Sequence, residues 1–200
     1  MYQPQFKYAV SSADKVLRSH YKNGLTHALR QFNVDHVVLS HAEIKPSEDT
    51  YIILAHAKSE IALGGIRLEI KSSSNKLPIE SCCTSHQVNI QRKIDSLFRS
   101  GKMIAEVSGL WVNAAVKGLG LGPKLVLEAT TLGLDLGLDA LVCLPPQHTY
   151  DYFKRLSYSA DPDIPPMAYP DDRYISTVAW LYRAQPANIK YALNYFDLNN

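Results

Sequence analysis

A strand-like apolar run, a glycine-rich turn and a helical pattern follow one another between residues 106 and 125. The apolar run covers residues 107–116, the glycines lie in residues 117–122, and Pro123 opens the helical pattern, where its missing N–H needs no partner. Glycine lets the backbone approach a ligand closely. The free N–H groups and the dipole of a first helical turn attract anions. This order therefore predicts a phosphate or pyrophosphate site.

Two common phosphate-binding loops do not fit this stretch. A Walker loop needs Lys-Ser/Thr directly after its last glycine, but Pro123 and Lys124 follow Gly122. A dinucleotide-binding loop needs G-x-G-x-x-G with an acidic residue about 20 positions later, whereas Gly118, Gly120 and Gly122 alternate. The plain alternative is a tight strand-to-helix turn without a ligand.

The spacing does fit the pattern V-x-x-x-x-[R/Q]-x-x-G-x-G-x-x-L, read at Val112, Lys117, Gly120, Gly122 and Leu125, with Lys117 in place of Arg or Gln. It resembles the coenzyme A-binding motif of the GCN5-related N-acetyltransferases (GNAT). The resemblance implies a central mixed, mostly antiparallel sheet and acetyl-CoA or another acyl-CoA as donor. Backbone N–H groups near residues 110–112 would then hold the thioester carbonyl. The residues that it assigns to coenzyme A binding are Leu110, Trp111, Val112, Lys117, Gly118, Leu119, Gly120, Leu121, Gly122 and Lys124.

Three further stretches resemble the acyl-homoserine lactone (autoinducer) synthases and the long-chain N-acyl amino acid synthases, which share the GNAT fold. One is L-P-I-E at residues 77–80; the others follow the patterns G-x-x-R-L and E-x-S-R-[FL]-x-V. Arg67, Glu106 and Ser108 match these patterns, while Gly109 replaces the Arg. This branch implies a long acyl chain, often from acyl carrier protein, and an amino acid or S-adenosylmethionine as acceptor. It is the narrower alternative to a coenzyme A-dependent N-acetyltransferase.

N-acyl transfer needs a base for the amine, donors for the oxyanion and a proton for the departing thiolate. Glu106 interrupts an apolar strand, which suggests burial and a raised pKa, so it is the candidate general base. Its plain alternative is an ion pair with Arg67. We assign Arg67 to substrate binding, where it would hold an acceptor carboxylate. Ser108 is assigned to the catalytic site, holding a water or the amine, unless its hydroxyl only bonds a sheet neighbour.

The proton donor is the weakest part of the likeness. Residues 153–158 resemble the Y-E-K-L-G-F segment of the family, but Phe153 stands where many members carry the tyrosine that protonates the thiolate. Tyr152 is expected to point elsewhere on its helix, which leaves Tyr150, Tyr158 or no acid at all. The missing tyrosine also keeps open a non-catalytic module that binds coenzyme A or a partner.

Composition is that of an ordinary soluble domain. The chain has 200 residues, 46% hydrophobic and 20% charged, with a net charge of +2, which predicts one domain over residues 1–200. The charge gives no case for nucleic acid, and no apolar run approaches about 18 residues, so no membrane span is expected. Cysteines without disulfide or metal spacing favour a cytoplasmic protein without a metal. The expected partner is a small-molecule amine or amino acid, and a homodimer stays open.

Periodicity and turn residues predict the order of the elements. Helices are expected from Asp14, again after Gly24, and over residues 85–98, 123–137, 149–156 and 188–196. Strands are expected over residues 35–40, 51–57, 61–70, 102–113, 140–144 and 173–183. Antiparallel hairpins followed by a βαβ crossover indicate an α/β fold, with one mixed sheet and helices on both faces.

Overall fold

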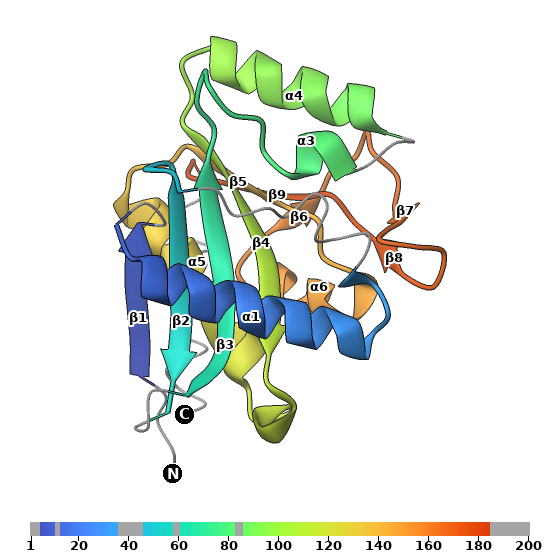
Figure 1. Ribbon diagram of the computed structural model, residues 1–200. Helices are drawn as coiled ribbons and strands as arrows, with labels where there is room; N and C mark the ends of the chain where they lie inside the picture. The colour runs from blue at the N-terminus through green and yellow to red at the C-terminus, as the bar shows by residue number, and fades with distance from the viewer. Residues whose placement is uncertain (1–4, 11–12, 36–45, 58–60, 83–85, 185–200) are drawn as a thin grey trace.

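One mixed sheet organises the computed structural model, which describes residues 5–10, 13–35, 46–57, 61–82 and 86–184 (Figure 1). Its strand order is β1-β2-β3-β4-β5-β9-β6. All pairings are antiparallel except that of β4 with β5, which confirms the predicted mixed, mostly antiparallel sheet. The strands are β1 (Gln5–Val10), β2 (Thr50–His56), β3 (Ala62–Ile70), β4 (Ile104–Val112), β5 (Ala140–Cys143), β6 (Ser159–Ala160) and β9 (Ala179–Tyr182).

Helices cover both faces of the sheet. On one face lie α1 (Lys15–Gln31), the short α3 (Ile79–Cys82) and α4 (Gln87–Arg99); on the other lie α5 (Leu121–Asp135) and α6 (Gln147–Arg155) (Figure 1). The alternation of strand side chains explains the two layers, because neighbours point to opposite faces. In β2, Ile52 and Leu54 pack against α1. Ile53 and Ala55 join the larger core under α5.

The first helix differs from its prediction. A single α1 runs through Gly24 instead of ending there. The glycine is needed for packing, because a Cβ at this position would overlap the Trp111 ring below the helix. Tertiary contact thus overrides the usual reading of glycine as a helix breaker. Asp14 caps the helix as expected, accepting from the Leu17 N–H at 2.8 Å.

Other boundaries also shift. The predicted strand over residues 173–183 is two strands, β8 (Ile175–Ser176) and β9. The chain changes partner there: β8 pairs with β7 (Met167–Ala168), whereas β9 pairs with β5. Strand β1 was not predicted, although Phe6, Tyr8 and Val10 alternate along it. Residues 36–40 of one expected strand and the terminal helix expected at 188–196 lie outside the described residues. No described helix has the length and apolar character to cross a membrane.

Candidate active site

Strands β4 and β5 part in the middle of the sheet. Their parallel pairing joins Ile104 to Ala140 and ends with Glu106 opposite Val142. Strand β5 stops at Cys143, while β4 continues to Val112 and stays paired with β3 on its other side. Among the residues that the structure describes, no strand therefore pairs with the β5 side of β4 from residue 107 onward. Backbone groups on such an edge need another hydrogen-bond partner.

A β-bulge lies in the part of β4 beyond its pairing with β5. The register with β3 shifts between Gly65 and Arg67, and Gly109 in β4 has a φ of 62°. The Tyr21 hydroxyl, from α1, donates to the Gly109 carbonyl oxygen at 2.8 Å. A Cβ on residue 109 would overlap that hydroxyl. Gly109 is thus required by the bulge and by Tyr21, which explains why Arg cannot stand here as it does in the synthase pattern.

The glycine turn follows β4 and a short 3-10 helix, η1 (Ala114–Val116). Gly118 and Gly120 have φ values of 83° and 77°, and no atom of the described residues, chain neighbours aside, lies within 4 Å of where their Cβ atoms would stand. Helix α5 begins at Leu121, not at Pro123, with Gly120 as its N-cap. The left-handed φ of Gly120 lets the helix start two residues before the proline. The N–H groups of the first turn lack intrahelical acceptors, and this turn contains no acidic residue.

Two lysines flank this turn. The Lys117 Nζ lies 5.8 Å from the centre of the Phe32 ring, at the end of α1. Lys124 is half-buried in the first turn of α5. The N–H groups, the dipole and the two cations together make the open turn suitable for an anion.

Glu106 is buried at the point where the two strands part. It is 3% exposed, and one carboxylate oxygen, Oε2, accepts the Ile79 N–H at 2.7 Å. Burial raises the pKa of Glu106 to about 7, although the Ile79 hydrogen bond and the Arg67 charge act in the opposite direction. A carboxyl that titrates near neutrality can accept a proton at physiological pH.

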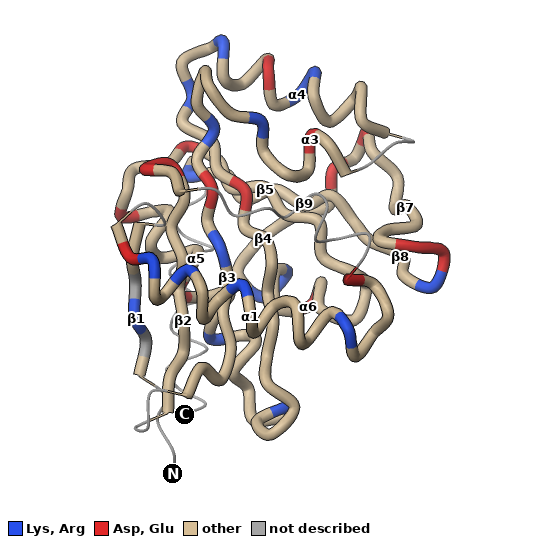
Figure 2. Tube along the Cα trace, viewed as in Figure 1, with Lys and Arg blue, Asp and Glu red and all other residues tan. Residues whose placement is uncertain are grey.

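Arg67 does not make the ion pair with Glu106 that the sequence left open. Its Nε lies 3.6 Å from Glu69 Oε2, and its Nε and Nη2 donate to Ser108 Oγ at 3.3 and 3.1 Å. Ser108 therefore does bond a sheet neighbour, since Arg67 is its register partner on β3. These residues form a polar row on one face of β3 and β4, since Arg67 pairs with Ser108 and Glu69 with Glu106. Figure 2 shows that both acidic and basic residues occur on these two strands. We define the polar row as Arg67, Glu69, Glu106 and Ser108.

The aromatic residues of the α6 region differ in their surroundings. Phe153 is 4% exposed and packs edge-on against Tyr158. Burial raises the pKa of Tyr158 well above its usual value, and its hydroxyl lies 3.2 Å from Thr130 Oγ1. Burial also raises the pKa of Tyr150, which receives a backbone hydrogen bond from Ala160. Tyr152, expected to point elsewhere, lies beside the glycine turn: its ring is 3.3 Å from where a Cβ of residue 122 would stand.

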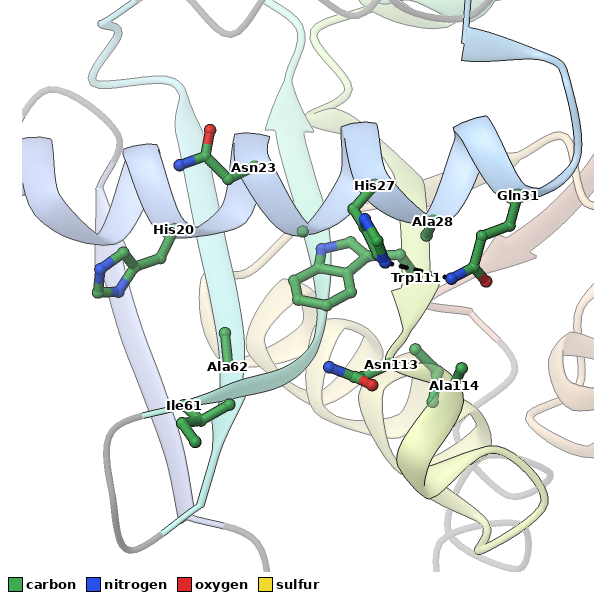
Figure 3. A pocket seen from close by; sticks show the side chains of 12 residues that line it. His20, Asn23, His27, Ala28, Gln31, Ile61, Ala62, Trp111, Asn113 and Ala114 are labelled. Atoms are coloured by element: carbon green, nitrogen blue, oxygen red, sulfur yellow. Dashed lines mark hydrogen bonds between the residues drawn. The ribbon is translucent and has the colours of Figure 1, made fainter.

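A separate cavity of about 440 Å³ lies beneath α1. Figure 3 shows the Trp111 ring under the helix, between the start of β3 and the end of β4. The Trp111 side chain thus faces α1 and away from β5, so only its backbone borders the gap between β4 and β5. The lining residues are His20, Asn23, Gly24, His27, Ala28, Gln31, Ile61, Ala62, Trp111, Val112, Asn113 and Ala114.

Comparison with known proteins identifies this architecture. No protein-family profile and no curated protein sequence matches the chain. Among solved structures it is similar to FeeM, an N-acyl amino acid synthase from uncultured soil microbes, with a TM-score of 0.67, 14% identity and coverage of 92% of this chain and 93% of that one. It is similar to BjaI, a CoA-dependent acyl-homoserine lactone synthase, with a TM-score of 0.64, 13% identity and coverage of 96% and 89%.

An acyl-CoA N-acyltransferase from Pseudomonas aeruginosa gives a TM-score of 0.57 at 15% identity, over 89% of this chain and 99% of that one. The names of these three proteins state different activities, but the proteins share one arrangement of strands and helices with this chain. The identities are too low to transfer an activity, whereas the coverage and TM-scores establish the architecture. The chain has the GNAT acyl-CoA N-acyltransferase fold.

Proposed function

We propose that the protein is an N-acyltransferase that moves an acyl group from a coenzyme A thioester to an amine. The observation that carries this proposal is the gap between β4 and β5, with the buried Glu106 at its closed end and an open glycine turn beyond the end of β4. A donor with an anionic group at one end and a reactive thioester at the other fits such a gap. The shared fold with acyl-CoA N-acyltransferases supports the same class of donor.

The donor would lie along the unpaired edge of β4. Its pyrophosphate oxygens would accept hydrogen bonds from the free N–H groups at the start of α5. The positive charges of Lys117 and Lys124 would lie nearby. The amides of its pantetheine arm would take the place of the missing strand and pair with residues 107–112. The thioester carbonyl would then receive N–H groups near Leu110, which would stabilise the oxyanion.

Residues of this chain would handle the protons. Glu106, when ionised, takes a proton from the acceptor amine, directly or through water. The amine nitrogen then attacks the thioester carbon, and the tetrahedral intermediate collapses by breaking the C–S bond. Tyr152 is our candidate for the proton donor to the thiolate, because it is the α6 tyrosine beside the glycine turn. The Tyr158 hydroxyl is buried against Thr130 Oγ1, whereas Tyr150 accepts the Ala160 N–H and keeps its own O–H proton, so Tyr150 is the alternative donor.

A second candidate is an N-acyl amino acid or acyl-homoserine lactone synthase, with the acyl chain on coenzyme A or acyl carrier protein. The polar row favours it. Arg67 is 3% exposed and pairs with Ser108, two residues after Glu106 on β4. Its guanidinium could therefore bind the carboxylate of an acceptor whose amine lies near Glu106. Under this candidate Ser108 Oγ is displaced from Arg67 by the substrate. Lipids of an expressing cell, analysed by mass spectrometry, would contain a new N-acyl product.

Donor binding is tested by thermal unfolding with acetyl-CoA, a long-chain acyl-CoA and acyl carrier protein. We expect an acyl-CoA to raise Tm, and Gly120→Trp to abolish the effect by filling the turn. Gly101→Trp is the matched control, because Gly101 also has a positive φ, 79°, and open space around it, far from the turn. Absence of stabilisation by every donor would overturn the proposal.

Catalysis is tested separately from binding. Thiol release from the donor, measured over a panel of amines and amino acids, should disappear in Glu106→Gln while the Tm shift by the donor persists. Tyr152→Phe should lower turnover without loss of donor binding. A protein that binds the donor but gives no thiol release with any acceptor would be a non-catalytic coenzyme A-binding module.

A further inference from the structure

A short buried segment between β3 and α4, at the start of α3, binds the carboxylate of Glu106. Ile79, the first residue of α3, is fully buried and donates its N–H to Glu106 Oε2 at 2.7 Å. Within the described residues, the other oxygen, Oε1, has no hydrogen bond. A carboxylate fixed by one oxygen keeps its second oxygen in one direction, where it can receive a proton.

A buried ion pair fixes the position of that N–H. Glu80, the residue after Ile79, accepts the Leu77 N–H through Oε2 at 2.6 Å, which closes the turn around Ile79. The same carboxylate pairs with Lys71 Nζ at 3.0 and 3.2 Å. The two side chains are 2% and 8% exposed. The pair therefore joins the end of β3 to the turn that carries the Ile79 N–H.

Further bonds hold both ends of this connection. The Lys71 N–H donates to the Ile104 carbonyl oxygen on β4 at 2.8 Å, and Lys71 Nζ also donates to the Asn75 carbonyl oxygen at 2.9 Å. On the other side, the Gln87 and Gln91 amides, from α4, donate to the Glu80 carbonyl oxygen at 3.0 and 2.9 Å. Strand β4 and helix α4 thus fix the turn from two directions.

Stability alone does not account for a pair this deeply buried, because desolvation of two charges commonly offsets their attraction, and apolar replacements are often as stable. Its distinctive consequence is geometric. We propose that Lys71 and Glu80 are positioning residues for the acyl transfer: they hold the Ile79 N–H on Glu106 Oε2 and leave Oε1 to take the proton of the amine. Only the transfer of the amine proton to Oε1 rests on the proposed function.

Charges around Glu106 come from several elements and must be separated from this effect. Arg67 and Glu69 on β3 and Glu80 on α3 act on Glu106, and Tyr21 on α1 and Cys143 on β5 respond to it. Removing Lys71 or Glu80 alone would change the net charge near the carboxylate. The double variant Lys71→Met/Glu80→Leu removes both charges together, so the net charge near Glu106 is unchanged. The main change is then the loss of the contacts that hold the turn around Ile79.

The direct measurement is the ¹³C titration of the Glu106 carboxyl, identified by its loss in Glu106→Gln. The Ile79 N–H favours the ionised form, so its displacement in Lys71→Met/Glu80→Leu should raise the pKa of Glu106 by about one to two units. Lys93→Met/Asp161→Asn is the control, because it removes another pair with a buried carboxylate, Nζ to Oδ2 at 2.7 Å, that does not touch this turn. An unchanged titration in the Lys71/Glu80 variant, or an equal shift in the control, would overturn the proposal.

A second pair of variants tests the N–H itself. Ile79→Pro removes this one donor, and proline is tolerated at the first helical position; Ile79→Val keeps the donor with a side chain of similar size. We expect the pKa to rise in the proline variant alone. If the Lys71→Met/Glu80→Leu variant does not fold, the two Ile79 variants still test the proposal. Equal pKa values of Glu106 in Ile79→Pro and Ile79→Val would overturn it.

Turnover distinguishes positioning from a merely structural role. The acid limb of kcat/KM should move up by the same one to two units in Lys71→Met/Glu80→Leu, which lowers the rate at pH 7 about five- to fifty-fold while the alkaline plateau is retained. A lower plateau with an unmoved limb would mean that the pair only supports the fold. If wild type shows no turnover, the proposed function fails, whereas the ¹³C titration still reports on Lys71 and Glu80.

Discussion

Replacing Glu106 with Gln should stabilise the protein, and by an amount that depends on pH. The folded protein raises the pKa of Glu106 from its ordinary value of 4.5 to about 7. Because the folded state binds this proton more tightly, the stability that the group contributes is fully present below about pH 4.5 and is lost as pH rises through 7. The shift corresponds to about 3 kcal/mol. A Gln side chain is uncharged at every pH and can still accept the Ile79 N–H through its oxygen.

The assay is urea unfolding of wild type and Glu106→Gln at several pH values between 4.5 and 8.5. The difference between the two free energies of unfolding isolates residue 106, because the other titrating groups are common to both proteins. It should be close to zero at pH 4.5 and rise to about 3 kcal/mol above pH 7.5, or roughly 6–12 °C in Tm for a chain of this length. A difference that stays constant over this range would refute the assignment of a buried, nearly neutral carboxyl.

Three glycine-related predictions test the packing around the site by thermal unfolding. Gly24→Ala should destabilise the protein by about 1–3 kcal/mol, because overlap with Trp111 outweighs the gain in helix propensity; a rise in Tm would contradict this packing. Gly109→Ala should destabilise it by about 2 kcal/mol or more through the left-handed φ and the Tyr21 hydroxyl. Adding Tyr21→Phe to Gly109→Ala should restore part of the lost stability, because it removes the hydroxyl that the new Cβ overlaps. If stability is not restored, the left-handed φ alone accounts for the loss. Ser157→Gly should stabilise by about 1 kcal/mol, since Ser157 has a φ of 69°; equal Tm values would argue against this strain.

The sheet and the glycine turn could be predicted because their signals are local. Apolar runs fixed the approximate positions of β2, β3, β4 and β5, and the alternating glycines between β4 and α5 marked an open turn. Each of these features depends on residues within about one element of each other. The expected mixed sheet followed from their order along the chain.

Features that depend on distant contacts were missed or misread. Gly24 suggested a helix end, but its role is to admit the ring of Trp111, 87 positions later. The hydrogen bond from Ile79 to Glu106 joins residues 27 apart, and no periodic pattern encodes it. The position of Tyr152 beside Gly122 could not be predicted, because the face that a short helix turns toward a neighbouring segment depends on how the helix packs. Even Gly109, a mismatch to the synthase pattern, has its explanation in Tyr21 on another element.

The same long-range contacts explain how a carboxyl can stand at this place in the core. Ile104 and Val142, its neighbours on the same face, belong to an apolar cluster, and an apolar residue at position 106 would extend it. Instead the chain buries a carboxyl, supplies the Ile79 N–H to one oxygen and fixes that N–H with a second buried charge pair. Each of these groups loses solvation on folding, so an apolar core of the same shape is often at least as stable. A carboxyl buried at such a cost, with its pKa near neutrality and beside an open strand edge, fits the general base that we propose for the acyl transfer.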